Sequence, residues 1–484
     1  MKALSLEIAI VLAGLGLLLL DLWTPLERKR QLGYAAAAAV GIVLVFSFTG
    51  LIDTGETRSV FGGMYVLDDL ALFFKRFFLL TALIVLVMSV DFAERFDTGI
   101  AEYYALVLFA LSGMMFAGSA NDFTLLFVSL ELITVTFYVL TSFQRRRLQS
   151  LEAGIKYLIL GALSSAFLVY GIALVYGTSG TMDFGKLTAA LALDKQLATQ
   201  PVLQAGLLLV LAGLGFKIAA FPFQMWAPDV YQGSPVPTTA FLAVGSKAAG
   251  VVLLLRLLGS AVPDVALHWE KLLMLLSAVT ILYGSLCAIP QRNLKRLLGY
   301  SSIASAGYLL LGFAAMNQSG SVAVLYYLAG YLFTVLAAFT VLCVVVRLTD
   351  NEDVTALAGL NQRSPLLATA LTLAMVSLAG IPPLAGFFGK FLLLKAVVEQ
   401  AVNYPAYYCL LGVALFGVVI SLYYYFGVVR AIYWSKDPAD LSPIELSRPI
   451  KISLYGCIGG MLYLGLFPDS VVALATVAVR ALWL

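Results

Sequence analysis

Residues 211–250 read LAGLGFKIAAFPFQMWAPDVYQGSPVPTTAFLAVGSKAAG. This stretch is apolar enough to lie in a membrane, yet it places Lys217 and Lys247 well inside hydrophobic runs. A charge at the centre of a bilayer costs at least ~2.5–3.5 kcal/mol. Apolar residues flank Lys217 on both sides, which argues against its side chain reaching an interface. The stretch therefore predicts that the two lysines line a polar path through the membrane.

Four prolines and a glycine separate the two lysines: Pro222, Pro228, Pro235, Pro237 and Gly233. Because proline removes a backbone donor and clashes with the preceding turn, we expect the helix that carries Lys217 to break after Ala220. Inside a membrane, such a break is tolerated only where the freed backbone groups are buried in protein or line a cavity. A broken helix beside a buried charge is thus a candidate functional site.

The composition identifies the class of protein. Of the 484 residues, 61% are hydrophobic and 12% are charged, whereas soluble domains carry about 25% charged residues. The apolar runs are about 20 residues long and continuous, which predicts transmembrane helices and excludes a β-barrel. The four cysteines are isolated, and the only histidine, His268, is expected in a loop. No metal, haem, iron–sulfur or nucleotide motif is present, and no basic helix suggests nucleic acid.

The apolar runs predict an all-α polytopic membrane protein with about fourteen transmembrane helices. They lie near residues 3–22, 33–52, 70–90, 103–119, 122–142, 153–177, 202–222, 236–259, 270–289, 297–316, 321–348, 365–398, 406–433 and 449–466. Residues 178–200 are interpreted as a surface loop with an amphipathic piece. Residues 467–484 are interpreted as an amphipathic helix in the interface.

Loop charges predict the orientation. Basic residues gather in alternate loops, at residues 28–30, 145–147, 292–296 and 436–451, and the opposite loops carry Asp53, Glu56, Asp68 and Asp69. The positive-inside rule places the basic loops in the cytoplasm and both termini on the outer, periplasmic side. Lys75, Arg76 and Lys395 are interpreted as anchors at helix ends or interfaces. No loop is long enough for a soluble catalytic domain, so we expect the protein to act within the membrane.

A second broken helix is predicted in the later part of the chain. Residues 377–395 read SLAGIPPLAGFFGKFLLLK, in which Pro382-Pro383 interrupts the run shortly before Lys390. Paired Gly/Pro-interrupted helices in two parts of one chain are typical of transporters built from structural repeats around a site at mid-membrane.

A carboxylate completes the set of buried charges. Glu131 lies about ten residues from either end of the run NDFTLLFVSLELITVTFYVL, residues 121–140. Desolvation favours the neutral forms of glutamate and lysine, whereas a Glu–Lys partner restores their charged forms. A row made of Glu131, Lys217, Lys247 and Lys390 can therefore load and release protons when one partner moves.

These residues resemble a known family. The segments SLELITVTFYVL, GFKIAAFPFQMWAPDVYQGSPVPTTAFLAVGSKAAG, NLKRLLGYSSIASAGYLLLG and GIPPLAGFFGKF are similar to the antiporter-like membrane subunits of bacterial respiratory complex I, the proton-pumping NADH:quinone oxidoreductase. They cover roughly residues 120–400. Lysine rather than glutamate at position 390, with VYQGSP in the loop, favours the N type among these subunits.

The resemblance implies two inverted five-helix repeats, each with a broken helix. It divides the chain into an N-terminal three-helix segment (1–100), a first repeat (101–260), a second repeat (261–435) and a C-terminal helix with its tail (436–484). It implies that Glu131 and Lys217 form the coupling pair, that Lys247 is the central relay and that Lys390 lies on the exit side. Tyr300, Ser302 and Ser305 are further candidates in YSSIASAGYLLL, where many relatives place a histidine at the position of Ser305.

The resemblance also implies the function and the partners. It implies a proton-translocating subunit in the bacterial cytoplasmic membrane that has no cofactor of its own. Its partners would be the other complex I subunits, including sister antiporter-like subunits, which hold FMN, iron–sulfur clusters and quinone. Three alternatives stay open: a subunit of a Mrp-type cation/proton antiporter, a subunit of a related membrane hydrogenase, and a scaffold without a transport role.

Overall fold

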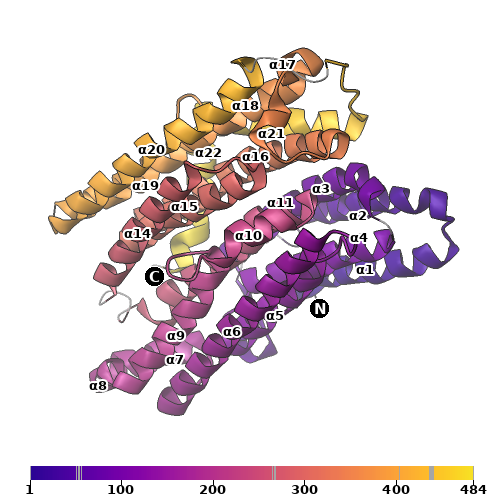
Figure 1. Ribbon diagram of the computed structural model, residues 1–484. Helices are drawn as coiled ribbons and strands as arrows, with labels where there is room; N and C mark the ends of the chain where they lie inside the picture. The colour runs from indigo at the N-terminus through magenta and orange to yellow at the C-terminus, as the bar shows by residue number, and fades with distance from the viewer. Residues whose placement is uncertain are drawn as a thin grey trace.

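The computed structural model describes residues 2–50, 52, 55, 57–96, 98–263, 265, 269–402, 404–434 and 441–482. Asp53, Glu56, His268 and Lys436 lie outside these ranges. Most of the chain forms long helices that run roughly parallel to one another (Figure 1), and the predicted all-α membrane class is confirmed. In the described ranges the only sheet is a two-stranded antiparallel hairpin of β1 (Arg58–Val60) and β2 (Tyr65–Leu67), in which Val60 pairs with Tyr65.

The helices have the following bounds. The first part of the chain contains α1 (Ser5–Trp23), α2 (Leu32–Phe46), α3 (Asp69–Phe92), α4 (Ile100–Gly118), α5 (Phe123–Thr141), α6 (Leu148–Ser179), α7 (Phe184–Leu193), α8 (Lys195–Thr199), α9 (Pro201–Ile218), α10 (Trp226–Gly233), α11 (Val236–Phe241) and α12 (Lys247–Arg256). The second part contains α14 (Glu270–Ala288), α15 (Leu294–Ala314), α16 (Gln318–Thr349), α17 (Leu360–Arg363), α18 (Pro365–Ala379), α19 (Ala385–Ala401), α20 (Ala406–Trp434), α21 (Arg448–Leu466) and α22 (Pro468–Val479).

The number of spans agrees closely with the prediction. Thirteen helical segments among the described residues are long and apolar enough to cross a membrane. The remaining predicted span, 365–398, is divided into α18 and α19 at the Pro382-Pro383 break. The inverted repeats and the division into four parts stay predictions.

Two boundary predictions were wrong. The second span was predicted to reach residue 52, but α2 ends at Phe46. Residues 178–200, predicted as a loop with an amphipathic piece, are mostly helical: α6 continues to Ser179, and α7 and α8 follow. The amphipathic piece is α7, which buries Phe184, Leu187 and Leu191.

The C-terminal tail contains a helix, as predicted. Helix α22 packs against α3 and α16, and its position in the membrane interface stays a prediction. Small residues permit this close approach, because Ala475 and Ala478 lie on the buried face of α22. Farther along the tail, Leu482 packs against Gly259, where an added Cβ would lie 3.1 Å from the Cβ of Leu482.

Lys75 is not the helix-end anchor that the sequence suggested. Its side chain is fully buried and forms an ion pair of 2.7 Å with Glu7 of α1, which is fully buried as well. Lys75 also donates a hydrogen bond to the hydroxyl of Tyr65 at 2.6 Å, and Tyr65 donates to Glu7 at 2.9 Å. The position of Lys75 near the start of a span could not reveal that α1 supplies a buried carboxylate.

Helices α14 and α15 pack closely against each other. Gly284 of α14 lies so close to α15 that an added Cβ would be 2.3 Å from the backbone nitrogen of Ala304. Gly307 of α15 faces Ile281 in the same way, with its Cβ position 2.6 Å from the Ile281 backbone nitrogen. Small residues at such positions let transmembrane helices approach closely.

We expect Gly284→Ala to destabilise the protein by about 1–3 kcal/mol, because the added methyl group meets backbone that has no room to move. The matched control is Gly412→Ala on α20, where nothing lies within 4 Å of the added Cβ. The measurement is the midpoint of thermal unfolding of each variant in detergent. Equal midpoints for the two variants would contradict this view of the interface.

Candidate functional site

At the first helix break, after α9, side chains form hydrogen bonds with the backbone groups that the break leaves free. Helix α9 ends at Ile218, slightly earlier than predicted, and Ala219 adopts a left-handed conformation (φ 59°). The carbonyl of Phe216 accepts a hydrogen bond of 2.9 Å from the indole Nε1 of Trp226, and the backbone N–H of Phe221 donates to Thr280 at 3.1 Å. The freed backbone groups are thus satisfied inside the protein, as a break at membrane depth requires.

Lys217 occupies the last turn of α9, directly before this break. Its side chain is buried, and its Nζ donates a hydrogen bond of 3.0 Å to the hydroxyl of Thr134 on α5. Its aliphatic stem crosses α12 at Gly250, where an added Cβ would lie 3.1 Å from the Lys217 Cγ. Gly250 is three residues beyond Lys247, so α12 joins the surroundings of the two lysines.

Glu131 is half-buried on α5 and faces α6. Its Oε1 accepts a hydrogen bond of 2.5 Å from the hydroxyl of Ser165. Among the described side chains, no ion pair joins Glu131 to Lys217. Thr134, which accepts the hydrogen bond from Lys217, lies one helical turn beyond Glu131 on α5. The coupling of the two groups stays a prediction.

Lys247 begins α12, directly after the π-helical turn Leu242–Ser246. π turns within α-helices are frequent at functional sites. The buried ammonium donates to the carbonyl of Ser302 at 2.5 Å and also to its hydroxyl. That hydroxyl is hydrogen-bonded to Tyr231 of α10 at 3.0 Å, and the Lys247 Nζ lies 5.7 Å from the ring centroid of Tyr331 on α16. Lys247 therefore connects four helices.

The other two candidates from the same motif lie differently. The hydroxyl of Ser305 donates to the carbonyl of Ser301 at 3.0 Å. Tyr300 lies against Arg296, whose guanidinium carbon is 5.9 Å from the Tyr300 ring centroid. The structure thus places Ser302 in direct contact with a candidate lysine and leaves Ser305 and Tyr300 outside that contact.

Lys390 closes the second helix break. Helix α18 ends at Ala379, and Gly380 is left-handed (φ 84°). The Nζ of Lys390 donates to the carbonyls of Leu378 at 2.7 Å and Ala379 at 3.3 Å, and it lies 5.0 Å from the ring centroid of Tyr308. Carbonyls at a helix C-terminus favour a positive charge, so this ammonium replaces the helical donors that the break removes.

A small cavity beside Lys390 is lined by a residue that also faces Lys247. Tyr327 and Tyr331 of α16 line it, along with Ser377 of α18. Because Tyr331 also faces Lys247, one phenol borders both sites. Sequence reasoning missed this residue, although the run YYLAGY at residues 326–331 places three tyrosines inside an apolar span.

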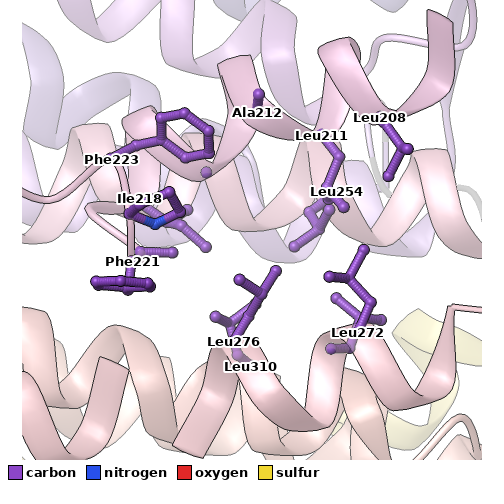
Figure 2. A pocket seen from close by; sticks show the side chains of 14 residues that line it. Leu208, Leu211, Ala212, Ile218, Phe221, Phe223, Leu254, Leu272, Leu276 and Leu310 are labelled. Atoms are coloured by element: carbon purple, nitrogen blue, oxygen red, sulfur yellow. The ribbon is translucent and has the colours of Figure 1, made fainter. Parts of the chain in front are cut away.

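An apolar cavity of about 210 Å³ lies on the other side of the first break. Figure 2 shows Leu272, Leu276 and Leu310 of α14 and α15 facing Ile218 and other residues of the α9 region across it. An apolar lining offers water no hydrogen-bond partners. This cavity therefore does not extend the polar row from Lys217 toward α14.

Lys295, which the sequence suggested to be a loop charge, is fully buried and paired. It forms an ion pair of 2.9 Å with Glu352 and donates to the carbonyl of Ser234, at the end of α10, at 2.9 Å. Arg147 binds the same carboxylate at 2.7 Å. Burial acts to raise the pKa of Glu352, but the cations Lys295 and Arg147 outweigh it, so this pKa lies below its ordinary value.

Arg256 is a second buried cation that sequence reasoning missed. It binds Asp68, interpreted above as a loop acid, at 2.8 Å and 3.1 Å, and it donates to the carbonyl of Gly118 at 2.8 Å. Its position within the predicted span 236–259 could have identified it.

By contrast, Lys395 is 59% exposed and lies 3.9 Å from Glu399, outside the lysine row. In the described ranges, no cluster of His, Cys, Asp and Glu has a geometry suited to a metal ion.

Spanning helices, two broken helices and a row of buried lysines define a transporter-like membrane protein. Residues 120–420 match the profile of a family described as the NADH:quinone oxidoreductase/Mrp antiporter membrane family, and the chain belongs to this family. The chain is 39% identical to NADH-quinone oxidoreductase subunit N of Desulforamulus reducens, over 98% of its own length and 97% of that protein. It is 40% identical to the subunit of the same name from Heliobacterium modesticaldum, over 99% of each chain.

Solved structures agree with this assignment. A chain of respiratory complex I from Thermus thermophilus with bound aureothin is 33% identical, with a TM-score of 0.80 and coverage of 97% of this chain and 99% of that one. A chain of the Mrp complex from a Dietzia species has a TM-score of 0.85 at 21% identity, over 99% of this chain and 98% of that one, a likeness of fold alone.

We expect Glu352→Gln to lower the free energy of unfolding at neutral pH by about 3–5 kcal/mol, because it leaves Lys295 buried without a counter-charge. The folded pKa of Glu352 is depressed, so its contribution is fully present above about pH 4.5, the ordinary value, and is lost as the pH falls through the folded pKa. The difference from the unsubstituted protein should thus narrow in acid.

The measurement is the midpoint of thermal unfolding as a function of pH. The control is Glu399→Gln, which removes a partly exposed carboxylate from α19. A difference between Glu352→Gln and the unsubstituted protein that stays constant from neutral to acidic pH would contradict the role of this ion pair.

Proposed function

We propose that this chain is the proton-translocating, N-type membrane subunit of an NADH:quinone oxidoreductase. The observation that carries the proposal is the row of Lys217, Lys247 and Lys390, all buried in spanning helices and all bonded to neutral acceptors. The subunit itself carries no redox centre in this proposal. FMN, iron–sulfur clusters and quinone belong to partner subunits, whose electron transfer drives the proton movement.

The proposed path runs from Glu131 and Lys217 through Lys247 to Lys390. Glu131 bonds Ser165 of α6, and Lys217 of α9 bonds Thr134, one turn from Glu131 on α5, so a shift of either side chain changes the electrostatic environment of the other. Ser302 holds Lys247, and Tyr331 lies between the sites of Lys247 and Lys390. Lys390 is the group on the exit side.

The setting of the subunit is part of the proposal. It lies in the bacterial cytoplasmic membrane, with the basic loops in the cytoplasm and both termini on the periplasmic side. Sister antiporter-like subunits and the other complex I subunits are its partners. Its fold comprises two inverted five-helix repeats, at 101–260 and 261–435, between an N-terminal segment and a C-terminal helix.

In the two alternatives, proton movement is coupled either to the exchange of another cation or to electron transfer from a donor other than NADH. The likeness to a Mrp complex chain favours a cation/proton antiporter, and the likeness to a chain of an archaeal membrane-bound sulfane sulfur reductase (TM-score 0.87, 23% identity) favours another electron donor. Partner subunits recovered in mild detergent distinguish them. Flavin and iron–sulfur subunits that oxidise NADH support the proposal, whereas small antiporter subunits alone support cation exchange.

We expect Lys217→Ala, Lys390→Ala and Glu131→Gln to reduce proton pumping to background, because each removes one proton-carrying group while the helices remain apolar. The measurement is NADH-driven acidification of inverted membrane vesicles, with the amount of assembled complex determined in the same membranes. Lys395→Ala is the matched control, since this lysine is exposed and outside the row. Equal loss in Lys395→Ala would refute the assignment of Lys390.

We expect Ser302→Ala to lower the number of protons pumped per NADH, because Lys247 loses its hydroxyl partner but keeps the Ser302 carbonyl. Ser302→Thr, which restores a hydroxyl, should recover most of the loss. The control is Ser277→Ala, which removes a buried hydroxyl that bonds Gly307 away from the lysines. An unchanged ratio in Ser302→Ala would show that this hydroxyl does not position Lys247.

A further inference from the structure

A crevice lies at the end of the bundle where α14 gives way to α15 and α20 approaches its C-terminus. Its volume is about 490 Å³, within the range of small-molecule sites. Arg292 and Arg430 line it together with the aromatic residues Tyr423, Tyr424 and Phe426. The lysine row described above does not include any of these residues.

The two arginines carry charge that the protein leaves without a counter-ion. Both are exposed, and neither guanidinium forms an ion pair with a described carboxylate. The nearby carboxylate of Glu352 is already bound by Lys295 and Arg147. Two unpaired guanidinium groups in one crevice fit an anion with several oxygens, such as a phosphate group, which arginine binds in a bidentate manner.

The surroundings of the crevice match the depth of lipid headgroups. Tyr423 is 71% exposed and Phe426 is 46% exposed, and Trp434, 70% exposed, ends the same helix. Exposed aromatic side chains near the end of a spanning helix are typical of the belt at the membrane–water interface. A ligand here therefore meets cations at its polar end and aromatic and apolar side chains along its length.

We propose that this crevice binds an anionic phospholipid. Arg292 and Arg430 hold the phosphate, and an acyl chain follows Tyr423 and Phe426. Basic pockets between transmembrane helices on the cytoplasmic side bind anionic lipid headgroups. The proposal is independent of proton translocation, since it concerns bound lipid and none of the lysines in the row.

The test measures lipid retained by the protein, extracted in mild detergent together with its native partners. The variants are Arg292→Gln, Arg430→Gln and their combination, with Arg145→Gln as the matched control because Arg145 is an exposed arginine of another basic loop. Tightly bound phospholipids are counted by mass spectrometry, and the delipidated protein is then titrated with phosphatidylglycerol, phosphatidylcholine or inorganic phosphate.

We expect each arginine substitution to weaken phosphatidylglycerol binding about fivefold, and the two combined to abolish retention of one anionic lipid. Arg145→Gln should match the unsubstituted protein. Phosphatidylcholine should not restore the lost lipid, and inorganic phosphate should not compete for the site. Equal retention by the double variant and Arg145→Gln would overturn the proposal. It would also fail if a photo-crosslinker at position 423 labelled a neighbouring subunit instead of lipid, or if inorganic phosphate bound as tightly as phosphatidylglycerol.

Discussion

Hydrocarbon offers no partner to a buried cation, so each of the chain's buried ammonium and guanidinium groups must find its acceptor within the protein. The structure meets this requirement in two ways. Lys217, Lys247 and Lys390 donate to a hydroxyl or to backbone carbonyls. Lys75, Lys295 and Arg256 are instead paired with carboxylates. The kind of acceptor divides the buried cations into two groups.

The two groups differ in how firmly the charge is held. Removing one partner of a buried ion pair leaves an uncompensated charge and is strongly unfavourable. Glu7–Lys75 joins α1 to α3, Asp68–Arg256 joins the start of α3 to the end of α12, and Glu352–Lys295 joins a loop to α15. These pairs suit a fixed architecture. A neutral acceptor stabilises an ammonium group but leaves no uncompensated charge behind when the lysine loses its proton. Neutral acceptors therefore suit groups that gain and lose protons.

The sequence predicted the lysines with neutral acceptors better than the cations paired with carboxylates, for a physical reason. Lys217 and Lys390 stand deep in apolar runs beside proline breaks, so neither can reach water, and burial follows from the sequence alone. Lys75 and Lys295 lie near helix ends, where a long side chain can reach an interface as readily as a buried partner. Their burial depends on Glu7 and Glu352, which are distant in sequence. The bond from Ser165 to Glu131 likewise requires knowing that α5 and α6 pack side by side.

The two helix breaks are alike in backbone form but differ in what closes them. In α9, the carbonyl of Phe216 is satisfied by the indole of Trp226, a group that does not titrate. In α18, the carbonyls of Leu378 and Ala379 are satisfied by Lys390 itself. The negative end of the α18 dipole acts on this ammonium. In the proposed relay, a proton gained or lost at Lys390 would therefore change the electrostatics of the break that holds it, whereas Lys217 would change charge beside a break that remains closed.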